Sequence, residues 1–141
     1  MKPAVSAHAA SLQARWERIG LGVRCAYNPA RPEVLHHYVQ AARRLSRLQP
    51  EQEARIQRRM LELLLRTAED EALPWMWRAM CLEHLAWPLA RLTSLLARQG
   101  AGAEEVNGIE DRVQRATSVL DLPQQNASPA RRDAANPSGH A

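Results

Sequence analysis

Residues 73–89 hold the densest group of chemically useful side chains in the sequence: three of its four tryptophans, one of its two cysteines and one histidine. The spacing predicts a helix on which Trp77, Cys81 and His84 share one face. Trp75 lies elsewhere, roughly 160° from Trp77 at about 100° per residue. An exposed tryptophan is costly and is commonly used for binding. The segment is therefore a candidate contact surface, and a core helix that packs on both sides is the alternative.

A protein is the partner that such a surface suits best. Tryptophan and arginine supply much of the binding energy at protein interfaces, so these residue types are the expected anchors. A membrane partner is not expected, because no apolar run approaches the ~20 residues that a membrane helix needs. The anchors that we predict are Trp75, Trp77, Arg78 and Trp87.

The sequence also contains a possible metal-binding pair. Cys81 and His84 are three residues apart, a spacing that allows two side chains of one helix to bind the same metal ion. Further ligands would have to come from Cys25, His36 or His37. The same pair could bind iron or haem with no stronger support from the sequence, and the C-x-x-C-H motif for haem attachment is absent. A buried thiol beside a hydrogen-bonded histidine is the simpler explanation, so the sequence defines no cofactor.

Arginine is concentrated in residues 43–66, where two predicted helices meet at Pro50. Two helices joined in this way can form a helix-turn-helix. The second helix would begin at residues 51–53, Glu-Gln-Glu, whose carboxylates repel phosphate. A solvated face is therefore favoured over nucleic-acid binding. The arginines of this face are Arg43, Arg44, Arg47, Arg55, Arg58, Arg59 and Arg66.

Enzymatic activity is not expected. The sequence has no nucleophile elbow, phosphate-binding loop or dinucleotide fingerprint. Residues 69–71, Glu-Asp-Glu, are typical of a helix boundary rather than of a general acid and base, because acidic side chains interact favourably with the start of a helix. No group of residues in the sequence suggests the geometry that catalysis requires.

The elements that must position these side chains are helices. Of the 141 residues, 45% are apolar but only 4% are aromatic, and strong helix formers dominate. We therefore expect an all-α fold, a small irregular bundle of four to six helices. Apolar residues recur at steps of three and four in residues 12–26, 35–48, 56–67 and 106–120.

A further helical segment, residues 75–99, is interrupted by Pro88. An interior proline costs about 3 kcal/mol or kinks the helix, so we expect a kink or break near Trp87 and a short helix after it. Residues 100–102, Gly-Ala-Gly, are the expected connection to the last helix. In the second helix, the inward stripe is expected to end with Leu48.

The chain is expected to divide into a flexible N-terminus (residues 1–10), a helical domain (11–122) and a disordered tail (123–141). The tail lacks every large apolar side chain, so it cannot bury enough surface to offset its ordering entropy. Polar residues interrupt the N-terminal apolar stretch, and a signal peptide is not expected. Two cysteines outside any C-x-x-C pair fit a reducing bacterial cytoplasm.

Several stretches of the sequence form a recognisable set: Ala72-Leu73-Pro74-Trp75-Met76-Trp77-Arg78, Cys81-Leu82-Glu83, Pro88-Leu89, Leu63-Leu64-Leu65 with Thr67-Ala68, and Trp16 in an early helix. Together they resemble the FagA family of small proteobacterial proteins, and the resemblance covers roughly residues 12–122. That family often has histidine between its two tryptophans, where this chain has Met76, which argues against a metal role for the segment.

The FagA family is associated with iron-regulated genes near a fumarase and a manganese superoxide dismutase. The resemblance implies a setting, iron limitation or oxidative stress, and no reaction. We therefore expect a non-enzymatic helical protein that binds a partner protein in bacterial iron or redox homeostasis. The alternatives are a metal, iron or haem binder using Cys81 and His84, and a nucleic-acid binder using the arginine-rich face of residues 43–66.

Overall fold

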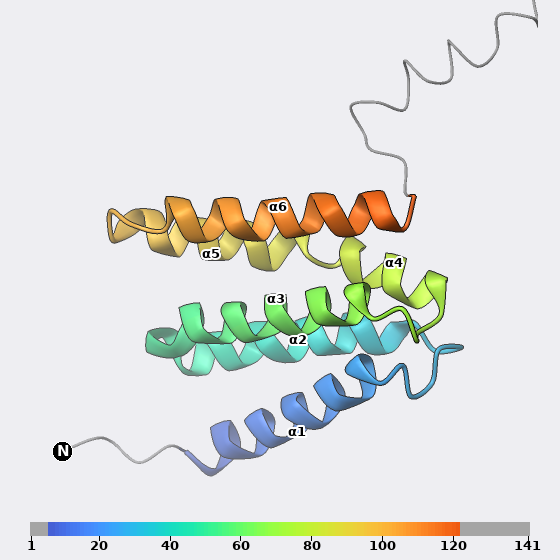
Figure 1. The fold of residues 1–141 in the computed structure, drawn as a ribbon. Helices are drawn as coiled ribbons and strands as arrows, with labels where there is room; N and C mark the ends of the chain where they lie inside the picture. Colours follow the sequence, from blue (N-terminus) through green and yellow to red (C-terminus); the bar gives the residue numbers. More distant parts are fainter. Residues whose placement is uncertain (1–5, 122–141) are drawn as a thin grey trace, which may run out of the picture.

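Six α-helices and one 3-10 helix form an irregular bundle in the computed structural model, which describes residues 6–121 (Figure 1). No strand occurs within these residues. The all-α bundle of four to six helices that the sequence predicts is therefore confirmed. The elements are α1 (Ala7–Arg24), α2 (Glu33–Leu48), η1 (Pro50–Gln52), α3 (Glu53–Glu69), α4 (Trp75–Glu83), α5 (Ala86–Arg98) and α6 (Ala103–Val119).

The central element is α3. In Figure 1, α1 lies on one side of the pair formed by α2 and α3, and α4, α5 and α6 lie on the other side. α3 packs against each of the other five α-helices. Its apolar residues must therefore be buried on more than one face. Those buried side chains are Ile56, Met60, Leu61, Leu64, Leu65 and Ala68.

Ser6 determines where α1 begins. Its side-chain oxygen accepts a hydrogen bond from the backbone N–H of Ala9 at 3.0 Å, which satisfies one of the donors left free at a helix start. The helix therefore starts at Ala7, and Ala9 is already buried. The predicted flexible segment, residues 1–10, is wrong from Ala7 onward, because those residues belong to the first turn of α1.

The chain leaves the helical path between α4 and α5, at His84 and Leu85, rather than at Trp87. Pro88 lies in the first turn of α5, where a backbone N–H has no intrahelical partner, so the proline removes no hydrogen bond there. In a continuous helix, its ring would clash with the carbonyl of His84, four residues earlier. The predicted break is confirmed, but it lies three residues before the predicted position.

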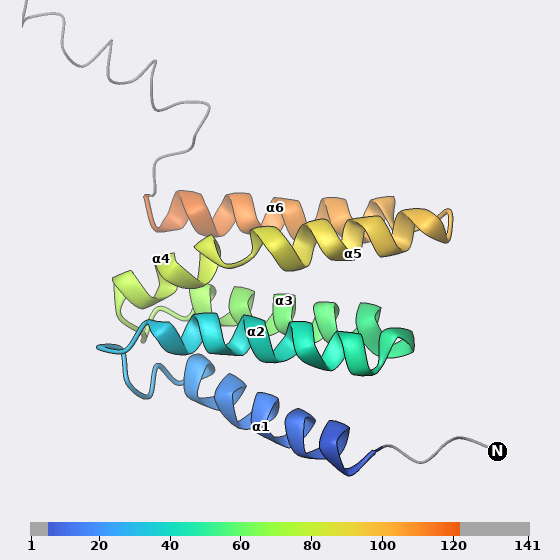
Figure 2. The same ribbon diagram turned by 180° about the vertical axis from the view of Figure 1, so that it is seen from behind.

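Two glycines form the tight connection between α5 and α6. Gly100 and Gly102 have φ angles of +70° and +98°, a region that residues with a side chain rarely adopt. A Cβ atom at Gly102 would also lie 2.5 Å from the Cβ atom of Leu96. Residues 100–102 are thus the connection that the sequence predicts, and they return α6 alongside α5 (Figure 2).

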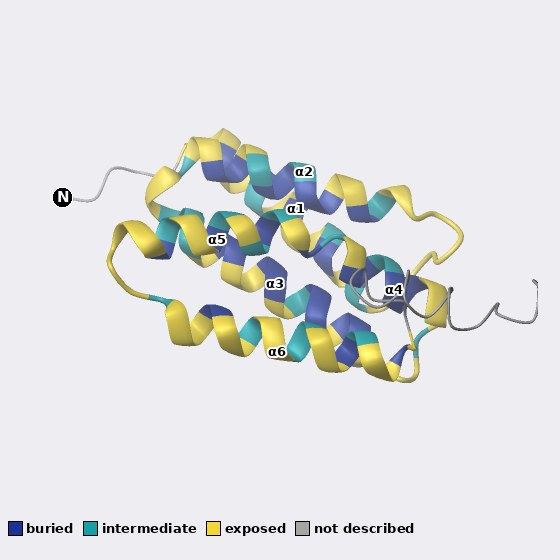
Figure 3. Cartoon of the chain, turned by 90° about the horizontal axis from the view of Figure 1, so that it is seen from above, coloured by how far each residue is buried: buried dark blue, intermediate teal, exposed yellow. Residues whose placement is uncertain are grey.

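The inward positions predicted from periodicity are mostly buried, whereas Leu48 is 46% exposed. Leu48 follows the buried Leu45 by three residues, but α2 ends at Leu48, so the stripe runs out at the end of the bundle. Figure 3 shows buried residues along α3 and exposed residues covering the outer sides of α5 and α6. The core therefore lies around α3 and the inner faces of its neighbours.

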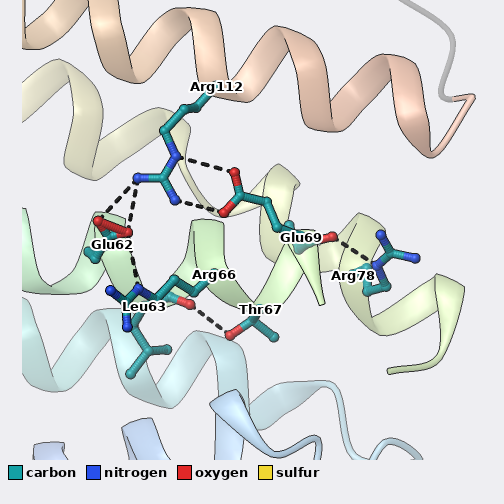
Figure 4. Close-up of polar contacts among 8 residues, drawn as sticks. Glu62, Leu63, Arg66, Thr67, Glu69, Arg78 and Arg112 are labelled. Carbon is teal, nitrogen blue, oxygen red and sulfur yellow. Dashed lines mark hydrogen bonds and ion pairs between the residues drawn. The ribbon is translucent and has the colours of Figure 1, made fainter. Parts of the chain in front are cut away.

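Ion pairs join α3 to α5 and α6. Arg112 of α6 bridges two carboxylates of α3, with its Nη1 atom 2.9 Å from Glu62 and its Nη2 atom 2.7 Å from Glu69 (Figure 4). Arg91 of α5 donates two hydrogen bonds to Glu53, at 2.5 and 2.8 Å. The guanidinium group of Arg91 holds the pKa of the Glu53 carboxyl below its ordinary value.

Two remaining predictions concern the whole chain. Among residues 6–121, no helix is both long enough and apolar enough to span a membrane. The tail that is predicted to be disordered, residues 123–141, lies outside the described residues.

Substitution of Gly102 by alanine is expected to destabilise the fold by about 1–3 kcal/mol, because its φ angle disfavours a side chain and a Cβ atom would collide with Leu96. Gly108→Ala is the matched control. Gly108 lies in α6 with open space around its Cβ position, so this change should stabilise the helix by about 0.5–1 kcal/mol. Urea unfolding measures both changes. A stability loss of equal size in the two variants would contradict this account of the turn.

Arg91→Gln is expected to make the fold less sensitive to acid. Arg91 lowers the pKa of Glu53 from its ordinary 4.5, so the pair contributes stability above that pH and loses it as pH falls through the lowered pKa. Without Arg91, the folded and unfolded pKa values of Glu53 come closer together. Urea unfolding between neutral pH and about pH 3 should then show a shallower decline than in the unaltered protein.

Arg55→Gln provides the control for this pH dependence. It also removes one positive charge, but Arg55 of α3 is exposed and has no ion-pair partner within the described part of the chain. Its acid-induced loss of stability should match that of the unaltered protein. If both variants showed the same shallow decline, net charge rather than the Arg91–Glu53 pair would be responsible.

Candidate functional site

Trp77 lies in the protein interior. Pro74 is extended and precedes the first turn of α4, which places the Trp77 indole between α4 and the end of α1. The side chain is 1% exposed, and its Nε1–H donates a hydrogen bond to the carbonyl oxygen of Val23 at 2.9 Å. The prediction that Trp77 anchors a partner is therefore wrong, because the indole ring and its only donor are both used within the fold.

Arg78 is also buried, and it binds the end of α3. Its Nε–H donates to the carbonyl oxygen of Ala68 at 2.8 Å (Figure 4). Carbonyl groups in the last turn of a helix have no intrahelical partner, so this contact satisfies one of them. The predicted role of Arg78 in partner binding is wrong, because the side chain is largely buried and its Nε–H is used within the fold.

The other two predicted anchors lie in different places. Trp75 is 48% exposed, and its Nε1–H donates to the carbonyl oxygen of Leu120 at 2.9 Å, just after α6. Trp87 is half-buried in the first turn of α5, with the guanidinium carbon of Arg43 4.2 Å from its ring centre. Trp87 therefore does not form one surface with Trp77, although the helical periodicity placed the two on one face.

The structure reveals a surface of which the sequence analysis identified only Trp75. Six large hydrophobic side chains are exposed within residues 6–121, and five of them belong to the end of the bundle where α1 ends, α4 begins and α6 ends (Figure 1). We call this surface the apolar end. Each of the five lies outside the inward stripe of its segment, which is the signal that could have identified it. The residues are Leu21, Tyr27, Trp75, Met76 and Val119.

Cys81 and His84 are not arranged as a metal site. Cys81 is fully buried, and burial raises the pKa of its thiol to about 12, which disfavours the thiolate that binds metals. His84 Nδ1 is 2.8 Å from the carbonyl oxygen of Met80. Among residues 6–121, no three His, Cys, Asp or Glu side chains lie close enough together to hold a metal ion.

The arginines of residues 43–66 do not form one basic face. Arg58 pairs with Glu105 of α6 at 2.7 Å, whereas Arg59 pairs with Glu17 of α1 at 3.2 Å. Because α1 and α6 lie on opposite sides of α3, these neighbouring arginines point apart (Figure 1). A continuous row of unpaired cations, which nucleic-acid backbones require, is therefore interrupted at α3.

Comparisons of the chain with protein-family models, with curated proteins and with solved structures found no match. The resemblance to the FagA family therefore stays a prediction from the sequence.

The two cysteines are expected to differ sharply in reactivity. Cys25 is exposed and should react with DTNB at about pH 8, whereas Cys81 should react only after unfolding, because it is buried and its pKa is raised to about 12. The absorbance change of the native protein should therefore correspond to one thiol per chain, and that of the unfolded protein to two. Cys25→Ser should abolish the native reaction. A fast reaction that remains in this variant would show that Cys81 is accessible.

Proposed function

We propose that the protein is a non-enzymatic helical module that binds a partner protein through its apolar end. The observation that carries the proposal is that five of the six large hydrophobic side chains exposed within residues 6–121 belong to segments that meet at this end of the bundle. Exposed apolar side chains scattered singly need no explanation, but their concentration at one end of a protein favours a role in binding.

Hydrogen bonds hold the three helices of the apolar end together. Trp75 binds Leu120, beside Val119 of α6, and Trp77 binds Val23, two residues from Leu21 of α1. The exposed side chains are therefore presented on a fixed backbone. A preformed surface loses less conformational entropy on binding than a mobile one, which favours its use as an interface.

Trp75 is the best anchor of the apolar end. Its indole donor is already satisfied by Leu120, so the exposed half of the ring offers apolar area without an unpaired N–H group. Nearby, the ion pair of Arg24 and Asp70, at 2.8 Å, leaves no net charge on these two side chains. We therefore expect the partner to present an apolar segment, such as one face of an amphipathic helix, rather than a charged one.

The biological setting is proposed from the sequence alone. The resemblance to the FagA family supports a role in iron limitation or oxidative stress. The two cysteines outside any C-x-x-C pair support a cytoplasmic location.

A double substitution tests the apolar end without touching the core. Tyr27 and Met76 are 87% and 64% exposed and come from different segments, so Tyr27→Ser with Met76→Ser should leave the fold intact. Leu48→Ser is the control, because Leu48 is the one of the six large hydrophobic residues exposed within residues 6–121 that lies outside the apolar end. The unaltered chain and both variants are tagged, expressed in iron-starved cells and cross-linked before purification. Mass spectrometry then identifies the bound protein and the residues that are cross-linked.

The expected result is a protein that cross-links next to Trp75 and is retained by the unaltered chain and by Leu48→Ser. The double variant should bind it about tenfold or more weakly, as expected when interface side chains are removed. Equal retention by all three proteins would contradict the proposal. Sedimentation distinguishes one further case. If the unaltered chain and Leu48→Ser were dimers and the double variant a monomer, the apolar end would bind a second copy of the chain, and the partner-protein proposal would be overturned.

A further inference from the structure

A pocket of about 510 Å³ opens between α2, α3 and α5, away from the apolar end. Figure 2 shows α2 and α5 running side by side on this face. The volume falls within the range of sites for small molecules and is larger than a bare ion requires. Side chains from all three helices line the pocket, among them Arg43, Ser46, Arg47, Glu53, Trp87 and Arg91.

The charges in the pocket are unbalanced. Three guanidinium groups face one carboxylate, and that carboxylate, Glu53, already accepts two hydrogen bonds from Arg91 at 2.5 and 2.8 Å. Arg43 and Arg47 have no ion-pair partner among residues 6–121. The pocket therefore contains two positive charges that no carboxylate of the described chain neutralises, which favours an anionic ligand.

Two polar atoms of the pocket are buried without a hydrogen-bond partner. Ser46 is only 6% exposed, and its Oγ atom is one of them. The Nε–H of Arg43 is the other. A buried donor without an acceptor is costly, and most such groups in native proteins are satisfied. Because both residues line the same pocket, its wall contains hydrogen-bonding capacity that the described part of the fold does not use.

The guanidinium group of Arg43 is held in place before any ligand binds. Its central carbon lies 4.2 Å from the centre of the Trp87 ring, a cation–π contact that orients the planar group. The Glu53–Arg91 pair forms another part of the wall. An oxyanion entering the pocket would therefore meet an arginine whose orientation is already fixed, and an aromatic ring beside it.

We propose that this pocket binds a small organic anion that carries a phosphate or carboxylate group. Arg43 and Arg47 bind the oxyanion, the hydroxyl of Ser46 donates a hydrogen bond to it, and Trp87 contacts the apolar part of the ligand. The site is independent of the apolar end, because none of its lining residues belongs to that surface.

Phenyl phosphate is a suitable probe, because it combines an oxyanion with an aromatic body, and inorganic phosphate and phenol test the two parts separately. When phenyl phosphate is titrated into the protein, the ¹H–¹⁵N NMR signals of the Ser46 amide and the Trp87 indole should shift. The shifts should reach saturation with a Kd of about 1 mM or tighter. Inorganic phosphate should bind more weakly at the same signals, and phenol should not compete. No saturable change at these signals with phenyl phosphate would overturn the proposal.

Matched variants separate the pocket from general attraction to a basic protein. Arg47→Gln removes an exposed, unpaired charge of the pocket and should weaken phenyl phosphate binding at least about tenfold. Arg55→Gln removes an equal charge outside the pocket and should leave the Kd within about twofold. Ser46→Ala should weaken binding several-fold without lowering the thermal midpoint, because the hydroxyl has no partner in the fold.

Two results would contradict the site. Equal losses in Arg47→Gln and Arg55→Gln would mean that phenyl phosphate follows net charge and occupies no defined pocket. A DNA duplex that displaced the probe and lost affinity equally in both arginine variants would assign the basic side chains to nucleic-acid binding instead.

Discussion

Because α3 packs against all five other α-helices, its apolar side chains have to be buried on several sides at once. Each leucine buried in this way contributes about 1.5–3 kcal/mol, so the burial of α3 is a major favourable contribution to the fold. Each of the other helices needs to bury only the face that meets α3 or a neighbouring helix. The side chains left outside the core include those of the apolar end and those of the arginine-lined pocket.

The helices themselves were predictable, because their apolar residues recur at steps of three and four and prolines or glycines mark the gaps. Errors occurred where a local pattern has more than one structural solution. Pro88 forbids a continuous helix, but it does not say where in the preceding turn the chain departs; the departure is at His84 and Leu85. Leu48 fits an inward stripe, but periodicity does not show that α2 ends there without a covering element.

The candidate sites were less predictable, since they depend on contacts between residues far apart in the sequence. Trp77 binds Val23, 54 residues away, and this contact decides that the indole is core and not surface. Arginine content suggested a basic face, but the pocket is created by the approach of α5, which brings Trp87 to Arg43. Exposed hydrophobic residues that break a helical stripe, such as Leu21 and Met76, were the signal present in the sequence.

The ion pairs of Arg112 with two glutamates favour one axial position of α6 along α3. Glu62 and Glu69 are seven residues apart, about 10.5 Å along the helix axis at 1.5 Å per residue. One guanidinium group reaches both, so this double contact is made at one axial position of α6 on α3. The bridge therefore adds an electrostatic contact, specific to one register, to the apolar packing of the two helices. Concentrated salt should weaken the bridge while leaving the buried contacts of α3 in place.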